Sequence, residues 1–149
     1  MRKFEVCKGF ENGDVVIPNR ATKKSAGYDL RSLISYDLKP SERYTFPTGL
    51  KASMEEDEVL YIFIRSSMAI KKGVRLSNSV GVIDADYYSN KDNDGHIMIS
   101  LFNFSNDVVH IEKGDRIAQG IFMKYLCVDD DIAVCEREGG FGSTNKESI

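Results

Sequence analysis

The sequence lacks a hydrophobic run long enough to cross a membrane. Its longest run, Val59–Ile64, is about a third of the length that a transmembrane helix requires. The N-terminal stretch MRKFEVCKGFENGD has a basic pair but not the apolar segment that follows such a pair in a secretory signal. We therefore expect a protein that does not associate with membranes and that works in the cytoplasm, or in the cytoplasm or nucleus of the host if the sequence is viral or from a phage.

Cysteine and histidine are scarce. The three cysteines, Cys7, Cys127 and Cys135, are odd in number, lie far apart and form no C-x-x-C pattern. This usage favours reduced, structural thiols in a cytosol-like compartment over a disulfide framework. His96 and His110 are also far apart, and no cysteine joins them at the spacing of a zinc site.

An excess of basic residues is missing as well. The formal net charge is −3, with 20 Lys and Arg against 23 Asp and Glu. A protein that binds nucleic acid through its phosphate backbone would usually show a basic stripe, so this class is disfavoured. A single small ligand that carries phosphate remains compatible with the charge.

Helical periodicity is almost absent, and the apolar residues instead follow a short period of two, which is typical of β-strands. One stretch, Ser66–Lys72, is predicted to form a helix of at most two turns. Turn-forming residues separate the strands, which favours a single all-β domain over residues 1–149 with a sandwich, jelly-roll or barrel architecture. The predicted strands are Phe4–Lys8, Tyr28–Leu33, Tyr44–Met54, Val59–Arg65, Ile97–Phe104, Val108–Glu112 and Arg116–Val128.

Three acidic segments are interpreted as polar surface structure. Glu55–Glu58 and Asp129–Asp131 are predicted to be solvated turns. The run from Asn90 to Gly95 matches the first half of a calcium loop, but Leu101 stands where the closing glutamate belongs. We therefore interpret Tyr88–His96 as a long polar loop.

The segment GVIDADY, Gly81–Tyr87, carries the strongest candidate for acid–base chemistry. Asp84 lies beside apolar β-formers, and partial desolvation would raise the proton affinity of its carboxylate and suit it to accept a proton from water. The alternative is a plain hairpin, since Asp and Gly are ordinary turn residues.

Two further segments have the composition of phosphate sites. Arg65, Ser66 and Ser67 follow a predicted strand and open the short helix, where a cation, hydroxyls and backbone N–H groups could receive phosphate; an ordinary serine cap is the alternative. The C-terminal run GGFGST, Gly139–Thr144, lacks the G-K-[ST] of a Walker loop but places the aromatic Phe141 among glycines. Such an aromatic could close over a flat base.

Taken in order, five segments resemble the five motifs of the homotrimeric dUTPase family. They are SAGYDLRS (Ser25–Ser32), RSSMAIKKG (Arg65–Gly73), NSVGVIDADY (Asn78–Tyr87), KGDRIAQ (Lys113–Gln119) and GGFGST (Gly139–Thr144). The resemblance implies a jelly-roll-like subunit, a homotrimer and active sites shared between subunits. It further implies hydrolysis of dUTP to dUMP and pyrophosphate by water attack on the α-phosphorus, with Mg²⁺ on the triphosphate. This reaction keeps uracil out of DNA and supplies dUMP for dTMP synthesis.

The resemblance also implies a role for each matching residue. Asp84 would activate the water, and Tyr87 would pack on the deoxyribose and leave no room for a 2′-hydroxyl. Asp29 would act on the magnesium through its water shell. The residues implied to read uracil are Asn78, Gly81 and Ile83, covered by Phe141; those implied to bind phosphate are Arg65, Ser66, Ser67, Gln119, Arg137, Gly142, Ser143 and Thr144.

Two features depart from many members of the family. Arg137 precedes Phe141 by four residues where five are common, and the Tyr88–His96 loop is longer than the usual short turn. Residues 136–149 are predicted to form a flexible C-terminal arm that closes as a lid. The alternatives are a regulator of the same fold that senses nucleotide or binds a protein partner, and a dCTP deaminase, whose third motif differs from DADY.

Overall fold

The structure is a computed structural model that describes residues 1–133, 137, 139 and 140. It contains eleven β-strands, one α-helix and one 3₁₀ helix among these residues. In chain order they are β1 (Lys3–Val6), β2 (Tyr28–Arg31), β3 (Tyr36–Leu38), β4 (Arg43–Pro47), β5 (Leu50–Ser53), β6 (Glu58–Ile64), α1 (Ser66–Lys72), β7 (Val74–Leu76), β8 (Gly81–Asp84), η1 (Ala85–Tyr87), β9 (Met98–Asn103), β10 (Val109–Ile111) and β11 (Arg116–Lys124). The predicted all-β class with a single short helix is confirmed, and the helix has the predicted bounds.

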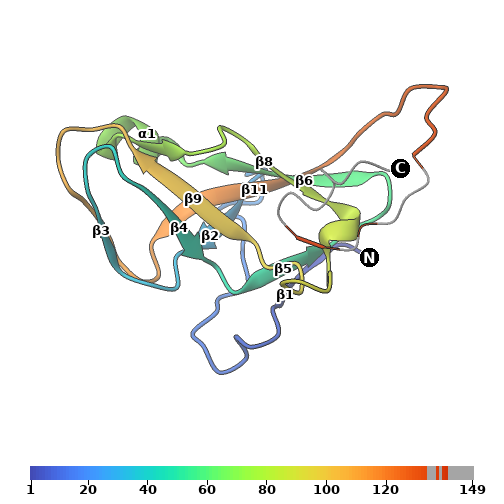
Figure 1. The fold of residues 1–149 in the computed structure, drawn as a ribbon, viewed down its shortest axis with the longest axis horizontal. Coiled ribbons are helices and arrows are strands. Elements are labelled where there is room, and N and C mark those ends of the chain that lie inside the picture. The colour runs from blue at the N-terminus through green and yellow to red at the C-terminus, as the bar shows by residue number, and fades with distance from the viewer. Residues whose placement is uncertain (134–136, 138, 141–149) are drawn as a thin grey trace.

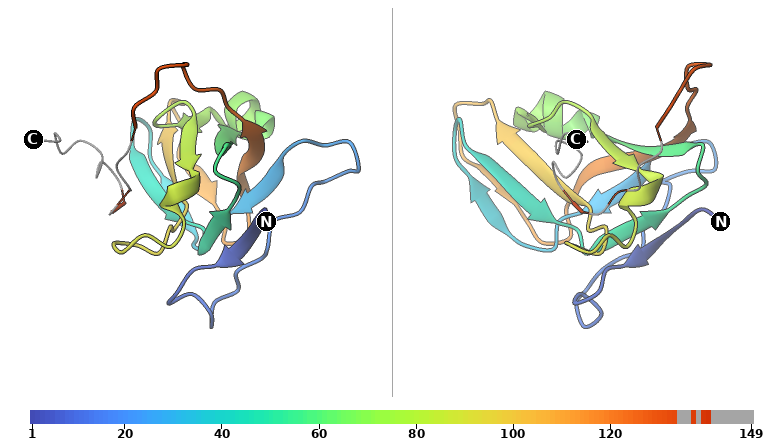
Figure 2. Two further views of the ribbon diagram at one scale, coloured as in Figure 1. Left: turned by 90° about the vertical axis from the view of Figure 1, so that its right-hand side faces the viewer. Right: turned by 45° about the vertical axis from the view of Figure 1, so that its right-hand side comes forward.

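Two antiparallel sheets enclose the core (Figure 1). One has the strand order β2-β11-β6-β8 and the other the order β4-β9-β7, while β1 pairs with β5 and β10 pairs with β3. Figure 2 shows the two layers from the side, with α1 at one end. Leu60, Ile62 and Ala118 from the first sheet pack in one cluster with Phe46 and Leu101 from the second.

The alternation of side chains along β9 shows how the sequence forms this core. Ile99, Leu101 and Asn103 are buried, and the residues between them are only partly so. Asn103 is polar and fully buried, but its amide donates to the carbonyls of Leu38 and Asp107 at 2.9 and 2.8 Å. Its burial is therefore compensated, as buried polar groups require.

The prediction of one strand over Tyr44–Met54 is wrong, because two strands, β4 and β5, lie there and are separated by a turn at Gly49. Gly49 has a φ of 70°, and a Cβ there would lie 2.7 Å from Val15 and 2.9 Å from Leu33. Only glycine adopts this backbone at such close approach. The break sends β4 to pair with β9 and β5 to pair with β1.

Three strands, β3, β7 and β8, were not predicted, and the hairpin interpretation of Gly81–Tyr87 is wrong. Strands of three or four residues are too short to show a period of two. β7 pairs with β9, whereas β8 pairs with β6, so the turn at residues 77–80 carries the chain from one sheet to the other. Ser79 adopts a φ of 63° in this turn.

The predicted ends of two strands and one acidic turn also need correction. β11 stops at Lys124, and the chain then leaves the body as an extended segment in which Leu126 is 97% exposed (Figure 1). Glu58 is not a solvated turn residue but is buried at the start of β6, where Arg2 binds it through Nε and Nη2 at 2.8 and 2.6 Å. This pairing lowers the pKa of Glu58 to about 2.

Two further observations concern membrane-spanning helices and cysteines. Among the described residues, no helix is long and apolar enough to cross a bilayer. Cys7 is a buried free thiol, Cys127 is an exposed one, and Cys135 lies outside the described residues. Burial raises the pKa of Cys7 to about 11, so this thiol is unreactive and structural.

The two histidines are expected to affect stability with opposite dependence on pH. Burial lowers the pKa of His96, whose Nε2 accepts the Gly49 N–H at 2.9 Å, so its stabilisation is present above about pH 6.5 and is lost below it. Glu112 and Asp37 raise the pKa of His110, so its stabilisation is lost as the pH rises. In urea unfolding between about pH 5.5 and 8, the free energy of unfolding should therefore fall less on acidification in His96→Gln, and more in His110→Gln, than in the wild type. Equal pH slopes in all three proteins would contradict this assignment.

Candidate active site

One pocket opens where β8 meets β6 and β9. It is lined by the predicted base-reading residues Asn78, Gly81 and Ile83 and by the predicted sugar-facing Tyr87, together with side chains such as Met98 and Ser100. Gly81 pairs with Ile62 of β6, and a Cβ at this position would lie 2.9 Å from the Cβ of Ile62. The missing side chain thus sets how closely β8 can approach β6 at the pocket floor.

Asp84 and Tyr87 flank the turn of η1 that follows the pocket strand. Asp84 is the last residue of β8, and its side chain is 50% exposed, so the expected desolvation of this carboxylate is only partial in the single chain. Tyr87 is buried, and its hydroxyl donates to the carbonyl of His96 and accepts from the Asn93 amide, both at 2.9 Å. Burial raises the pKa of Tyr87, which keeps the phenol neutral.

Arg137 lies against the carboxylates of this region. Its Nη2 is 2.5 Å from Oδ2 of Asp84, and its Nε is 2.8 Å from Oδ1 of Asp86. The guanidinium also lies over the Tyr87 ring, 5.8 Å from the ring centroid. In this position Arg137 neutralises the two carboxylates that border the pocket.

A second group of predicted site residues gathers around Asp29. The Oδ1 of Asp29 is 3.0 Å from Nε of Arg65, and its Oδ2 is 3.2 Å from Nη1 of Arg116. Asp29 and Gln119 face each other across β2 and β11, and Gln119 donates to the carbonyl of Ile64 at 3.3 Å. The three sheet strands β2, β11 and β6 thus bring these residues to one edge of the molecule.

The start of α1 adds the two serines to this second group. The N-cap residue is Arg65 in an extended conformation, without a side-chain cap, so the serine-cap alternative is wrong. The hydroxyls of Ser66 and Ser67 make no hydrogen bond to other described residues, and Ser66 is exposed. Both hydroxyls are thus available to a ligand.

The two groups lie at opposite ends of β6. Asp84 pairs with Val59, while Arg65 follows the last residue of the strand, six positions further along. At about 3.3 Å per residue, this separates Asp84 from the Arg65 cluster by about 20 Å within one chain. The structure therefore brings the predicted base and sugar residues together and the predicted phosphate residues together, but keeps the two sets apart.

Sequence reasoning missed several residues that shape these two places. Arg116 binds Asp29, Asp86 binds Arg137, and Gly27 lies so close to Gln119 that a Cβ would be 2.3 Å from its Oε1. Arg116 lies within the quoted KGDRIAQ segment, so the pairing of that segment with β2 could have indicated it. The predicted residues Phe141, Gly142, Ser143 and Thr144 lie outside the described residues.

Comparison with known proteins agrees with the order of the motifs. A family model described as dUTPase matches residues 14–145. The chain belongs to the dUTPase family. The deoxyuridine 5′-triphosphate nucleotidohydrolase of Lactococcus lactis subsp. lactis (strain IL1403) is 49% identical over 146 residues, which covers 97% of each chain. That of Haemophilus influenzae (strain PittEE) is 38% identical over 139 residues, or 88% of each chain.

Solved structures show the same fold as this dUTPase family member. The crystal structure of the dUTPase from Streptococcus mutans superposes with a TM-score of 0.80 and 42% identity, covering 85% of this chain and 98% of that one. The dUTPase from phage phi11 of S. aureus reaches a TM-score of 0.71 at 21% identity over 91% of this chain and 98% of that one, a likeness of fold alone.

The close approach at Gly81 predicts a measurable cost for the smallest substitution. Gly81→Ala should lower the free energy of unfolding by about 1–3 kcal/mol, because the new Cβ must push β8 away from Ile62 of the paired strand. The control is Val82→Ala at the adjacent, 56% exposed position, which should change stability by less than about 0.5 kcal/mol. Urea denaturation of both variants measures the difference, and equal midpoints would show that the strands can separate without cost.

Proposed function

We propose that this protein hydrolyses dUTP to dUMP and pyrophosphate in the cytoplasm. The observation that carries the proposal is the pocket of Asn78, Gly81, Ile83 and Tyr87, whose strand β8 ends in Asp84, the residue after Ile83. Membership of the dUTPase family supports it. The reaction needs a nucleotide held by its base, a water molecule beside the α-phosphorus and a base to take the proton of that water.

Asp84 is proposed to take this proton. As the water oxygen bonds to the α-phosphorus, the bond to the bridging oxygen breaks and pyrophosphate leaves, while the proton of the water passes to the Asp84 carboxylate. The Asp84 carboxylate is half exposed and follows the apolar Ile83, so it can hold a water molecule by a hydrogen bond. Because this water is the nucleophile, the reaction needs no covalent intermediate. The ring of Tyr87 is proposed to pack on the deoxyribose, where its fixed position would exclude a 2′-hydroxyl.

The backbone of β8 near Gly81 is proposed to read the uracil edge. Fixed amide donors and acceptors reject a cytosine edge because its pattern leaves buried polar groups unpaired. The outer edge of β8 is not paired with another described strand, since the sheet order ends with β8. Its N–H and C=O groups are thus able to face a base together with the Asn78 amide.

The Asp29 cluster is proposed to bind the phosphates of the substrate and, indirectly, its magnesium. Each oxygen of Asp29 already faces a guanidinium, of Arg65 or Arg116, so this carboxylate suits contact through metal-bound water rather than direct ligation. Among the described residues no group of three metal-ligating side chains is present. Phosphate oxygens of the substrate would hold Mg²⁺, which when bound neutralises their charge. Ser66, Ser67 and Gln119 would complete the phosphate contacts.

The distance between the two groups carries a proposal about assembly. A single chain cannot place its own Asp84 and its own Arg65 cluster, about 20 Å apart, around one α-phosphorus. We infer that each complete site combines the Asp84 pocket of one copy with the Asp29–Arg65 cluster of another, in a homotrimer. The exposed segment that carries Leu126, Val128 and Ile132 away from the body offers apolar surface for such contact (Figure 1).

The C-terminal segment from residue 136 is proposed to act as the lid of the site. Phe141 would cover the uracil, and Gly142, Ser143 and Thr144 would approach the γ-phosphate. Arg137 is proposed to reach the same phosphate, for which it must exchange Asp84 and Asp86 for the substrate oxygens. This exchange would free the base at the moment when the substrate arrives.

The proposed reaction is tested by measuring pyrophosphate release. The wild type should release pyrophosphate from dUTP with magnesium, and much more slowly from dTTP, dCTP and UTP. Asp84→Asn keeps the size and hydrogen-bonding shape of the side chain but removes the base, so turnover should fall by about three powers of ten or more while dUTP binding measured by calorimetry persists. Ammonia release from dCTP would instead indicate a deaminase, and normal turnover in the variant would exclude Asp84 as the base.

The shared site is tested by mixing two inactive proteins. Asp84→Asn and Arg65→Ala should each be inactive alone, but co-refolded mixtures should recover activity because some sites receive an intact Asp84 pocket from one copy and an intact Arg65 from another. A mixture of Asp84→Asn with an inactive Tyr87→Ala protein is the control, since both changes lie in the same group. No recovery in the first mixture, or equal recovery in both, would contradict the assembly.

A further inference from the structure

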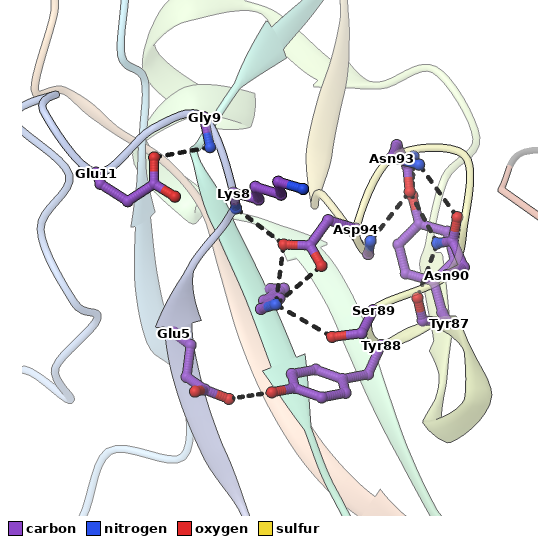
Figure 3. A network of polar contacts seen from close by, with 12 residues as sticks. Glu5, Lys8, Gly9, Glu11, Tyr87, Tyr88, Ser89, Asn90, Asn93 and Asp94 are labelled. Atoms are coloured by element: carbon purple, nitrogen blue, oxygen red, sulfur yellow. Dashed lines mark hydrogen bonds and ion pairs between the residues drawn. The ribbon is translucent and has the colours of Figure 1, made fainter.

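The loop between η1 and β9 is a compact, hydrogen-bonded structure. The Asn90 amide donates to the Tyr87 carbonyl and to Oδ1 of Asn93, both at 2.8 Å, and the Gly95 N–H donates to the same Oδ1 at 3.1 Å (Figure 3). Gly95 has a φ of 82°, and a Cβ there would lie 2.8 Å from the Tyr87 carbonyl oxygen. The loop is therefore folded tightly back upon Tyr87.

The same loop is fastened to the strand pair β1–β5. Asp94 accepts the Lys8 N–H at 2.8 Å, and its oxygens lie 2.9 and 3.0 Å from Nζ of Lys51, whose side chain is only 14% exposed (Figure 3). Tyr88 donates from its hydroxyl to Glu5 of β1 at 2.6 Å. These anchors to two strands hold the loop rigid against the body of the protein.

Asn93 and Asp92 in this loop contact Tyr87 and Gly140. The amide of Asn93 donates to the hydroxyl of Tyr87 at 2.9 Å. The carboxylate of Asp92 accepts the backbone N–H of Gly140 at 2.8 Å. A Cβ on Gly140 would lie 3.2 Å from Nδ2 of Asn93, so Gly140 lies directly beside the amide that holds Tyr87.

We propose that Asn93 is a positioning residue for substrate selection, because it fixes the Tyr87 ring that excludes ribonucleotides. The inference rests on the proposed function, because Tyr87 selects a sugar only if the pocket takes a nucleotide. It assigns a role to the Tyr88–His96 loop, which lies outside the five motif-like segments.

The physical basis is the small size of the group that must be rejected. A 2′-hydroxyl is excluded only if the Tyr87 ring cannot move aside, and the ring is held by two hydrogen bonds at its hydroxyl end, to the His96 carbonyl and from Asn93. Without the Asn93 bond the ring is held less firmly, and displacements of under an ångström suffice to admit an extra oxygen. The loss falls on discrimination between sugars rather than between bases.

The test compares kcat/KM for dUTP and UTP in loop variants. Asn93→Ala should lower the ratio of dUTP to UTP about tenfold and leave the ratio of dUTP to dCTP unchanged. Tyr87→Phe removes this hydrogen bond together with the one to the His96 carbonyl, so it should lower the sugar ratio at least as much, and the double variant should fall no further than Tyr87→Phe alone. Lys91→Ala is the matched control, because Lys91 is exposed in the same loop and its side chain contacts no described residue through a hydrogen bond or ion pair.

The ratio of kcat/KM values for dUTP and UTP distinguishes a positioning role of Asn93 from a loss of folded protein. A variant that is only less stable loses activity toward both nucleotides equally, so an unchanged sugar ratio in Asn93→Ala with a lowered melting temperature would overturn the proposal. Calorimetric binding of dUDP and UDP gives the same ratio without hydrolysis. It therefore distinguishes failure of this inference from failure of the proposed reaction.

Discussion

The pairing of β6 along both of its edges is the constraint on which the site depends. β6 is bonded to β11 on one side and to β8 on the other, and Arg65, which follows its last residue, binds Asp29 on β2. Its register with β8 places Gly81 opposite Ile62 and Asp84 opposite Val59. Because side chains alternate along a strand, a shift of this register by one residue would turn every pocket residue to the other face of the sheet.

This one strand also explains why the chemistry is divided. Both groups of predicted functional residues are attached to β6, but at opposite ends, so a rigid and well-packed sheet holds them apart more firmly than a loop could. Such a division is unsuited to a site within one chain and well suited to a site between copies, where each copy contributes a preformed half. The core around Leu60 and Ile62, which fixes β6, thereby fixes both halves.

Ion pairs between arginine and carboxylate side chains occur in both groups of predicted functional residues. Asp29 is held between Arg65 and Arg116, while Asp84 and Asp86 share Arg137. A phosphate-bearing substrate offers Arg137 a stronger partner than the half-exposed carboxylates of Asp84 and Asp86. The resting contacts therefore hold these arginines close to the proposed phosphate positions, and the Asn93 amide holds the Tyr87 hydroxyl.

The sequence by itself determined the residue chemistry and the class of the fold. The period of two indicated strands, the turn residues bounded most of them, and the order of five short motifs indicated the family, because these are local properties of the chain.

Tertiary structure alone decided which of these pieces meet. The break at Gly49 depends on contact with Val15 and Leu33, and the burial of Glu58 depends on Arg2, more than fifty residues away. Likewise, the distance between Asp84 and Arg65 follows from the register of β6 with β8, and the hold of Asn93 on Tyr87 follows from a loop fastened to β1 and β5. Such pairings form between distant segments, and no local pattern encodes them.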